Sequence, residues 1–453
     1  MKKFRNILII VVIAAILAAG SYFVYDRFFR DNPLPTGTGD PSGFLITCPS
    51  GSAYEIVSMS GSNRVESGGE FKFKIIVNDN YISDYMVVRA LGEILKPDGE
   101  GVYTISNVLS DISIVIDGMI YKAQVTEFTF SDHNLNGQIV GKKIVTTNIT
   151  KPSVMLPVSV DGIPITAISD NAFINNDAIV NLMIPEGYLE IGAYSFYGMK
   201  RMEKVYIADS LLNIGNYAFA SSVLLEEIIF SENSNLSRIG SYAFQNCVKL
   251  NDISLPHSLE SIGDYAYSYC HGLTDISVSS DAILNSKYLF RYSEGLSSVT
   301  IKGNINIIPE GIFSDCINLS SVTFEQGVEE IGENAFMNTG LVSLTLTKSI
   351  KEIGIGSFSG LTKLTQINLN EGLLHIGNSA FYNCLLLSSV SVPKSVLSIG
   401  NLAFAACDSL SEVNFGSGGA LNSIGNAAFA GKHTLSNELL GNGNMLESIV
   451  LPH

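Results

Sequence analysis

From about residue 161 onward, aromatic positions recur with a period of mostly 23 residues. They are Phe173, Phe196, Phe219, Phe244, Tyr267, Phe290, Phe313, Phe336, Phe358, Phe381, Phe404 and Phe429. Five residues before the aromatic stands an isoleucine in every period except the one with Asn285, and glycine usually follows it. A fixed period of this length is typical of a solenoid, in which each coil buries its apolar face against the next coil.

Each period is predicted to form three segments. A strand of the form Leu-x-x-Ile-x-Leu, as at 296–301, turns its last two apolar residues inward. A turn then leads to Ile-Gly, where glycine permits tight backbone geometry. Asn, Asp or Ser often follows, as at Asn216 and Asp264, and these residues favour helix N-caps. We therefore expect a parallel β-strand plus a short helix or turn in each of about 12 coils, with the aromatic residue buried.

The N-terminal pattern differs. A basic segment, 1–6, precedes an almost unbroken apolar run over 7–25, which as a helix spans roughly 28 Å. Small residues at 18–20 suit signal-peptide cleavage, whereas the apolar residues at 22–25 favour an uncleaved anchor. The basic cluster places the N-terminus inside the cell. We predict one N-terminal transmembrane helix with an extracellular C-terminal region, or a secreted protein if the segment is cleaved.

Between this run and the repeats, the pattern becomes short alternating strands separated by turns, as at 71–77 and 112–116. This spacing is typical of a small all-β sandwich. Asn136-Gly137 between apolar runs predicts a hairpin turn. The predicted order is a cytoplasmic basic segment (1–6), a transmembrane anchor or signal segment (7–25), a Pro/Gly linker (26–43), a β-sandwich (44–119), a β-rich connector or cap (120–160) and the solenoid (161–453).

The net charge of the chain disfavours some classes of binding partner. The net charge is −16, and residues 1–30 carry +4, which leaves −20 on the remainder. An acidic surface of this kind repels nucleic acid and anionic lipid. We expect no nucleic-acid partner and no membrane contact except through the N-terminal helix.

The full repeat unit is Ile-Gly-x-x-Ala-Phe-x-x-Cys-x-x-Leu-x-x-Ile-x-Leu-Pro, nearly whole at 239–256 and again at 376–393. It resembles the BspA-type leucine-rich repeat of bacterial surface proteins, and residues 156–166 match the lead-in to such arrays. The resemblance implies an extracellular solenoid used for adhesion to host proteins or other cells, with a ligand that varies among members. Residues 98–105 resemble immunoglobulin-like modules of bacterial surface proteins, which implies a spacer.

Five cysteines stand three residues after the column aromatic: Cys247, Cys270, Cys316, Cys384 and Cys407. We interpret them as small buried residues of a repeat column. Because residues of one column in adjacent coils lie within disulfide reach, bridges between Cys247 and Cys270 or between Cys384 and Cys407 stay open as an alternative.

Other motifs point to structure rather than chemistry. Asp132-x-Asn134-x-Asn136-Gly137 resembles the start of a calcium loop, but Lys143 stands where a glutamate is required, so a hairpin is expected. A dinucleotide-binding fingerprint is suggested by Gly354, Gly356 and Gly360, but the spacing of these glycines is wrong for it. Neither HExxH nor GxSxG occurs. We predict no catalytic residue, no cofactor and no metal site, and hence not an enzyme.

The remaining candidate is the outward face of the predicted sheet, which is acidic at one end and rich in hydroxyls beyond. The predicted protein-binding residues are Lys204, Tyr206, Glu227, Asp252, Asp275, Ser298, Thr300, Ser321, Thr323, Gln366 and Asn368. The absence of tryptophan and an expected scarcity of exposed aromatics argue against sugar stacking and tight hot spots. We therefore expect a cell-surface adhesion or protein-interaction protein with an extracellular protein partner. The alternative is a cell-envelope scaffold or a module that binds glycan or wall.

Overall fold

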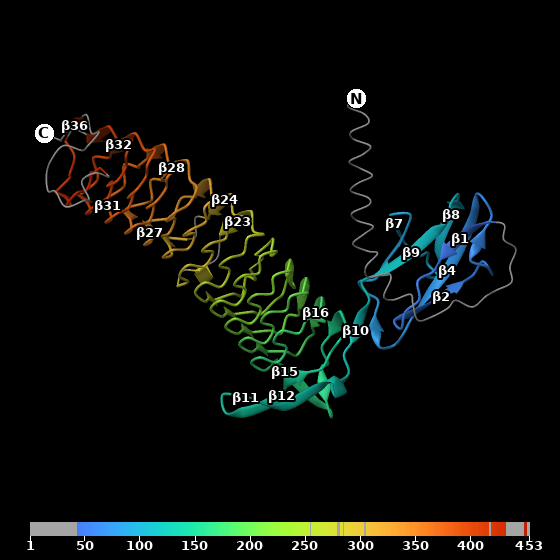
Figure 1. Cartoon of the computed structure of the whole chain (residues 1–453). Helices are drawn as coiled ribbons and strands as arrows, with labels where there is room; N and C mark the ends of the chain where they lie inside the picture. The colour runs from blue at the N-terminus through green and yellow to red at the C-terminus, as the bar shows by residue number, and fades with distance from the viewer. Residues whose placement is uncertain are drawn as a thin grey trace. The chain divides into compact units, whose positions relative to one another are not determined.

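The computed structural model describes residues 43–253, 255–278, 281–283, 285–302, 305–415, 418–431 and 448–450. They divide into two compact units (Figure 1). One comprises the described part of Met1–Ile76 together with Val87–Ile116, and the other comprises Val77–Met86 with the described part of Asp117–His453. The segment Val77–Met86 thus leaves the first unit and joins the second.

The first unit is an all-β module with two sheets. One sheet has the order β3-β1-β9-β6-β7 and the other β2-β4-β8. Alternating side chains such as Phe71, Phe73 and Ile105 are buried, as the period-2 pattern predicted. Its strands are β1 (Phe44–Thr47), β2 (Tyr54–Ser58), β3 (Arg64–Val65), β4 (Gly69–Val77), β6 (Val87–Ala90), β7 (Glu93–Leu95), β8 (Tyr103–Val108) and β9 (Ile112–Asp117).

The second unit is a solenoid in which each coil contributes a long and a short strand. The long strands pair in parallel from coil to coil, and their inward residues, such as Val205 and Ile207, are buried. At the first edge β5 pairs antiparallel with β10. The layer of long strands, named for the four-residue strands that predominate in it, consists of β5 (Tyr81–Ile82), β10 (Ile120–Lys122), β13 (Ser153–Met155), β16 (Asn181–Ile184), β18 (Lys204–Ile207), β20 (Glu227–Phe230), β23 (Asp275–Val278), β24 (Ser298–Ile301), β26 (Ser321–Phe324), β28 (Ser343–Thr345), β30 (Gln366–Asn368), β32 (Ser389–Val392), β34 (Glu412–Phe415) and β36 (Ser448–Val450).

The short strands carry the column isoleucine and form the second side of the coils. They start from the hairpin of β11 and β12, whose turn residues Asn136 and Gly137 both have positive φ, which confirms the predicted hairpin. They are β11 (Phe128–Leu135), β12 (Gln138–Thr147), β14 (Ser159–Val160), β15 (Ile163–Ile168), β17 (Glu190–Ile191), β19 (Asn213–Ile214), β21 (Arg238–Ile239), β22 (Ser261–Ile262), β25 (Ile307–Ile308), β27 (Glu330–Ile331), β29 (Glu352–Ile353), β31 (His375–Ile376), β33 (Ser398–Ile399) and β35 (Ser423–Ile424).

The third side of each coil is a turn, one of the two forms predicted, and the other form, a short helix, does not occur in the described coils. The described residues hold no α-helix, only the 3-10 turns η1 (Val125–Glu127) and η2 (Asp281–Ile283). Backbone amides of this side bond to the next coil: Phe196 N donates to the Ala218 carbonyl at 2.7 Å, and Phe219 N to the Ala243 carbonyl at 2.8 Å. Because these groups are already paired between coils, no i to i−4 ladder forms.

The prediction of a transmembrane helix also needs correction. The fold observed is a β-solenoid preceded by an all-β module, and within the described ranges no helix is long and apolar enough to cross a membrane. The run 7–25, on which that prediction rested, lies outside the described residues. The fold of the described residues therefore includes no membrane-spanning helix.

The predicted aromatic column is confirmed as the core. The rings from Phe173 to Phe404 are almost completely buried, and neighbouring rings from Phe173 to Phe429 stack with centroids 4.8 to 5.9 Å apart. The column glycines allow this close approach: a Cβ on Gly215 would come within 2.7 Å of Ala193 N in the preceding coil. Burial of the aromatic column and contact between backbones are therefore two parts of one packing scheme.

The polar residue after the column glycine accepts a hydrogen bond from the next coil and does not cap a helix. This bond between coils is called a staple below. Ala193 N donates to Asp170 Oδ1 at 2.7 Å, Ser241 N to Asn216 Oδ1 at 2.9 Å, and Asn401 N to Asn378 Oδ1 at 2.8 Å. The residue types that favour N-caps accept a backbone N–H here as well, but that N–H belongs to the next coil.

All five column cysteines are buried and free, so the structural interpretation is confirmed and the alternative of bridges is not. Cys247 Sγ donates to the Phe219 carbonyl at 3.3 Å, and Cys316 Sγ to the Phe290 carbonyl at 3.2 Å. Ser222 makes the same bond in its coil, to the Phe196 carbonyl at 3.1 Å. This column therefore requires a small side chain that donates a hydrogen bond to a backbone carbonyl of the preceding coil.

Replacing Phe313 by alanine removes a fully buried ring from the middle of the stack. We expect a loss of about 3–5 kcal/mol in the free energy of unfolding, because the surrounding coils collapse only partly onto the cavity. Urea denaturation followed by circular dichroism measures the loss. Ser321→Ala, on an exposed position of β26, is the control and should change stability by less than about 0.5 kcal/mol. An unchanged midpoint for Phe313→Ala would contradict the burial of the column.

Burial raises the pKa of the Cys270 thiol to about 12 and also raises the pKa of Cys316. A disulfide reagent needs access to the sulfur, which burial denies in all five column thiols, so they should stay silent at about pH 8 in the native protein and react in denaturant. A raised folded pKa stabilises the fold below the ordinary thiol pKa of 9.0, and this contribution is lost as the pH rises towards 12. Thiol titration and urea midpoints across this range test both statements. Rapid native reaction of more than the half-buried Cys48 would refute them.

Candidate functional site

The predicted binding residues lie on the outward side of the long strands, except Asp252. Lys204 and Tyr206 lie on β18, Glu227 on β20, Asp275 on β23, and Asp252 in the stretch between β20 and β23, exposed to solvent. The hydroxyl and amide members are Ser298 and Thr300 on β24, Ser321 and Thr323 on β26, and Gln366 and Asn368 on β30. Strand register places Lys204 beside Glu227, Asp275 beside Ser298, and Thr300 beside Thr323.

Two local networks hold charged members of this face. Lys204 Nζ lies 3.0 Å from Glu227 Oε2, and this hydrogen bond raises the pKa of Lys204. Farther along, Ser298 Oγ donates to Asp275 Oδ1 at 2.5 Å and Ser297 Oγ donates at 3.0 Å, and these hydrogen bonds lower the pKa of Asp275. Lys204 and Asp275 therefore keep their charges at neutral pH.

At the N-terminal end of this face is a hollow of about 330 Å³ that contains Tyr206. Tyr85 packs against Tyr206 with ring centroids 5.2 Å apart, and Met183 and the partly exposed Ile229 also line the hollow. The hollow combines two phenol rings with aliphatic side chains, as in anchor pockets for protein partners. Sequence reasoning missed Tyr85, because its segment was predicted to belong to the sandwich.

Acidic residues surround this hollow. Glu186 and Asp209 lie in its wall, and Glu186 is fixed by accepting the backbone N–H groups of Asp209 at 2.8 Å and Ser210 at 3.1 Å. Glu227, on the adjacent strand, does not line the hollow and is paired with Lys204, so the anionic rim consists of Glu186 and Asp209. An apolar centre with an anionic rim favours a partner segment that carries an apolar anchor between basic residues.

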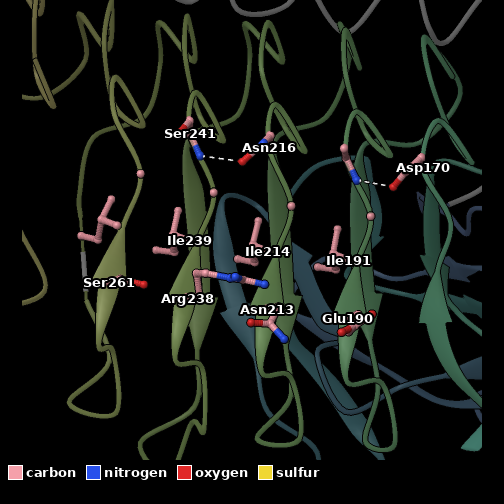
Figure 2. Close-up of a pocket in the computed structure, with 16 residues that line it drawn as sticks. Asp170, Glu190, Ile191, Asn213, Ile214, Asn216, Arg238, Ile239, Ser241 and Ser261 are labelled. Atoms are coloured by element: carbon pink, nitrogen blue, oxygen red, sulfur yellow. Dashed lines mark hydrogen bonds between the residues drawn. The ribbon is translucent and has the colours of Figure 1, made fainter. Parts of the chain in front are cut away.

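A groove of about 500 Å³ lies on the other strand layer (Figure 2). Glu190, Asn213 and Arg238 point into it from the neighbouring short strands β17, β19 and β21, and Ser261 follows on β22. Its upper rim holds the residues after the column glycines, including Asn216. These positions were not among the predicted site residues, although the polar residue directly before most column isoleucines was the available signal.

A second groove of about 500 Å³ occupies the same place farther along the solenoid. Glu352, His375 and Ser398 stand there where the first groove has Glu190, Asn213 and Arg238. His375 Nδ1 lies 2.8 Å from Ser398 Oγ, so these two side chains bond to each other.

The turn side, away from the predicted binding face, carries a row of partly exposed aromatics that sequence reasoning did not anticipate. Neighbouring rings stack with centroids 4.6 to 5.1 Å apart along the tyrosine row, which consists of Tyr194, Tyr217, Tyr242, Tyr265 and Tyr288. Every member has a left-handed backbone, with φ between 55° and 59°. That conformation costs a non-glycine residue on the order of 1–3 kcal/mol, which stacking of about 0.5–1.5 kcal/mol per pair offsets in part.

The row ends at Arg291, whose guanidinium lies 5.2 Å from the ring centre of Tyr288 and 4.7 Å from that of Tyr292. Arg291 Nε also bonds to Asp315 Oδ2 at 2.8 Å. At the equivalent positions of later coils the row is absent, and the same left-handed turn is made by Gly311, Asn334, Gly356, Ser379, Leu402 and Ala427.

The two layers of parallel strands, the stacked aromatic column and the repeated turn together define a leucine-rich solenoid. The profile described as "BspA type Leucine rich repeat region" matches in overlapping stretches, 166–282, 225–341 and 329–445, which cover more than half of the chain. The chain belongs to the BspA-type leucine-rich-repeat family. No curated protein sequence matches it.

Solved structures of leucine-rich-repeat proteins from bacteria are similar to this family member. A leucine-rich repeat protein from Bacteroides ovatus is 24% identical, with a TM-score of 0.50, and the match covers 69% of this chain and 93% of that one. The pneumococcal vaccine antigen PcpA is 18% identical over 68% of this chain and 85% of its own, with a TM-score of 0.40. The first likeness shows the shared fold.

We expect the Lys204–Glu227 ion pair of this BspA-type protein to matter little for stability. Both side chains are more than a third exposed, so solvent screens their attraction. Lys204→Gln should change the free energy of unfolding by less than about 1 kcal/mol. Urea denaturation in low and high salt is the measurement, and a larger salt-sensitive loss would show that the pair is shielded from water.

Proposed function

We propose that this BspA-type protein is a cell-surface adhesion or interaction protein that binds other proteins through the outward face of its long strands. The family of bacterial surface repeat proteins indicates protein–protein interaction. The single observation that supports this face is the hollow around Tyr206, where aromatic and aliphatic side chains lie within an acidic rim. The proposed partner is an extracellular protein segment with an apolar side chain between basic residues.

Binding rather than catalysis is the proposed role of this surface. Its members are an ion pair, serines and threonines, and the apolar hollow, and each charged group is engaged by a neighbour. The hydroxyl part beyond Asp275 supplies hydrogen bonds at coil spacing, which suits contacts repeated along an extended partner. Repeated weak contacts gain strength through multivalency.

The function is tested by incubating the purified protein with immobilised host matrix proteins and, separately, with purified cell-wall material. We expect retention on protein surfaces, and Tyr206→Ala with Ile229→Ser should weaken it about thirtyfold or more, because both side chains are proposed anchors. Gln366→Ala, on the same face but far from the hollow, is the matched control and should bind normally. Circular dichroism confirms that each variant is folded.

Selective retention on wall material alone would reject protein adhesion and favour the competing role, a cell-envelope scaffold or wall-binding module. Retention on matrix proteins that the Tyr206 and Ile229 variant leaves intact would reject the hollow as the binding centre.

A further inference from the structure

The groove on the short strands offers donors and acceptors together. Glu190 and Asp170 carry carboxylates, Arg238 a guanidinium, and Asn213 a side-chain amide, and they come from consecutive coils. The groove floor is the Ile-Gly backbone of the same coils, where the isoleucine side chains are buried and the partly exposed glycine Cα atoms are the apolar surface. A ligand that fits must therefore both donate and accept hydrogen bonds along its length while it presents apolar surface to the floor.

The tyrosine row stands beside the rim of this groove. Burial, together with Tyr265 and Asp264 beside the ring, raises the pKa of Tyr242, and burial with the carboxylate of Glu310 raises the pKa of Tyr288. Asp264 and Glu310 occupy the rim column, the position that Asn216 and Ser241 hold in the groove. Each tyrosine directly follows a rim-column residue in the chain, as Tyr217 follows Asn216, so the row runs along the rim at the spacing of the coils without lining the groove itself.

The fold itself does not require these tyrosines. Asn334, Gly356 and Ser379 make the same left-handed turn with φ between 53° and 60° beside the second groove. Glycine and asparagine adopt this conformation with less strain than tyrosine does. The tyrosines run through the coils of the first groove and the one coil that follows, although the turn itself does not require them. Ring stacking offsets part of their backbone strain, and ligand binding accounts for the rest.

Two extended ligands are disfavoured by the same residues. A polyanion would meet Asp170 and Glu190 on a chain of net charge −16. Asp170 accepts the Ala193 N–H and Glu190 pairs with His133, which leaves one oxygen of each carboxylate for a ligand. A proline-rich peptide offers carbonyl acceptors but few N–H donors, so these oxygens would lose water without gaining a partner. Sugar hydroxyls both donate and accept, and sugar rings carry apolar C–H faces.

We propose that the first groove, with the tyrosine row beside it, binds an extended uncharged polysaccharide whose successive sugar units lie over successive coils. Asn213, Arg238 and Glu190 bond to sugar hydroxyls, the Ile-Gly floor contacts the C–H faces, and the tyrosine hydroxyls extend the contact beyond the rim. This site is separate from the proposed protein-binding hollow, which lies on the long strands.

The test is affinity gel electrophoresis of the purified protein in gels that contain hydroxyethyl cellulose, mixed-linkage β-glucan, xylan, polygalacturonate or polyproline. We expect the neutral glycans to slow the protein, and titration calorimetry then gives the affinity. Asn213→Ala with Arg238→Ala should weaken binding about tenfold or more, because two groups that bond to hydroxyls are lost. Tyr217→Ser with Tyr242→Asn keeps residue types that the turn accepts and should also weaken it.

His375→Ala with Ser398→Ala changes the equivalent positions of the second groove and should leave glycan affinity unchanged. Tyr206→Ala with Ile229→Ser should also leave it unchanged, so failure of the protein-binding proposal is distinguished from failure of this one. The proposal is overturned if none of the neutral glycans slows the protein, if polygalacturonate or polyproline slows it instead, or if both groove variants weaken binding equally.

Discussion

The structure depends on hydrogen bonds between the same backbone positions of consecutive coils. In the strands these bonds form parallel ladders, and on the turn side they run from amides such as Phe196 N and Phe219 N to the carbonyls of the next coil. With the backbones held at this separation, each side chain must lie over its equivalent in the neighbouring coil. Stacked phenylalanines, stacked tyrosines and the chain of Asn and Asp staples are results of that single constraint.

Much of the solenoid fold was predictable because this constraint appears in the sequence as a repeat of nearly fixed length. The columns of Phe, Ile and Gly identify the solenoid, and alternation within a strand identifies which side chains face outward, as at Lys204 and Tyr206. The turn side was not predictable in the same way. Asn, Asp and Ser after glycine suit a helix cap and a staple between coils equally well, and only the neighbouring coil decides which bond forms.

The candidate site was predicted in part for a similar reason. The outward positions of the long strands followed from strand period, but the hollow around Tyr206 includes Tyr85, which lies more than a hundred residues earlier in the chain. The tyrosine row was visible in the sequence as Tyr two residues before the column aromatic. Its exposure could not be inferred, because a residue in a helix at that position would have pointed elsewhere.

The placement of Val77–Met86 bears on how this chain can be divided. Strand β5 lies within that segment and pairs antiparallel with β10, so the outermost strand of this sheet has only two residues and offers little backbone to another chain. The segments on either side of it, 69–76 and 87–95, belong to the other unit. A contiguous fragment that starts after residue 116 therefore lacks its own edge strand and exposes unpaired backbone. No single cut in the chain separates the two units intact. A truncation designed for crystallisation therefore has to keep Val77–Met86 together with the solenoid.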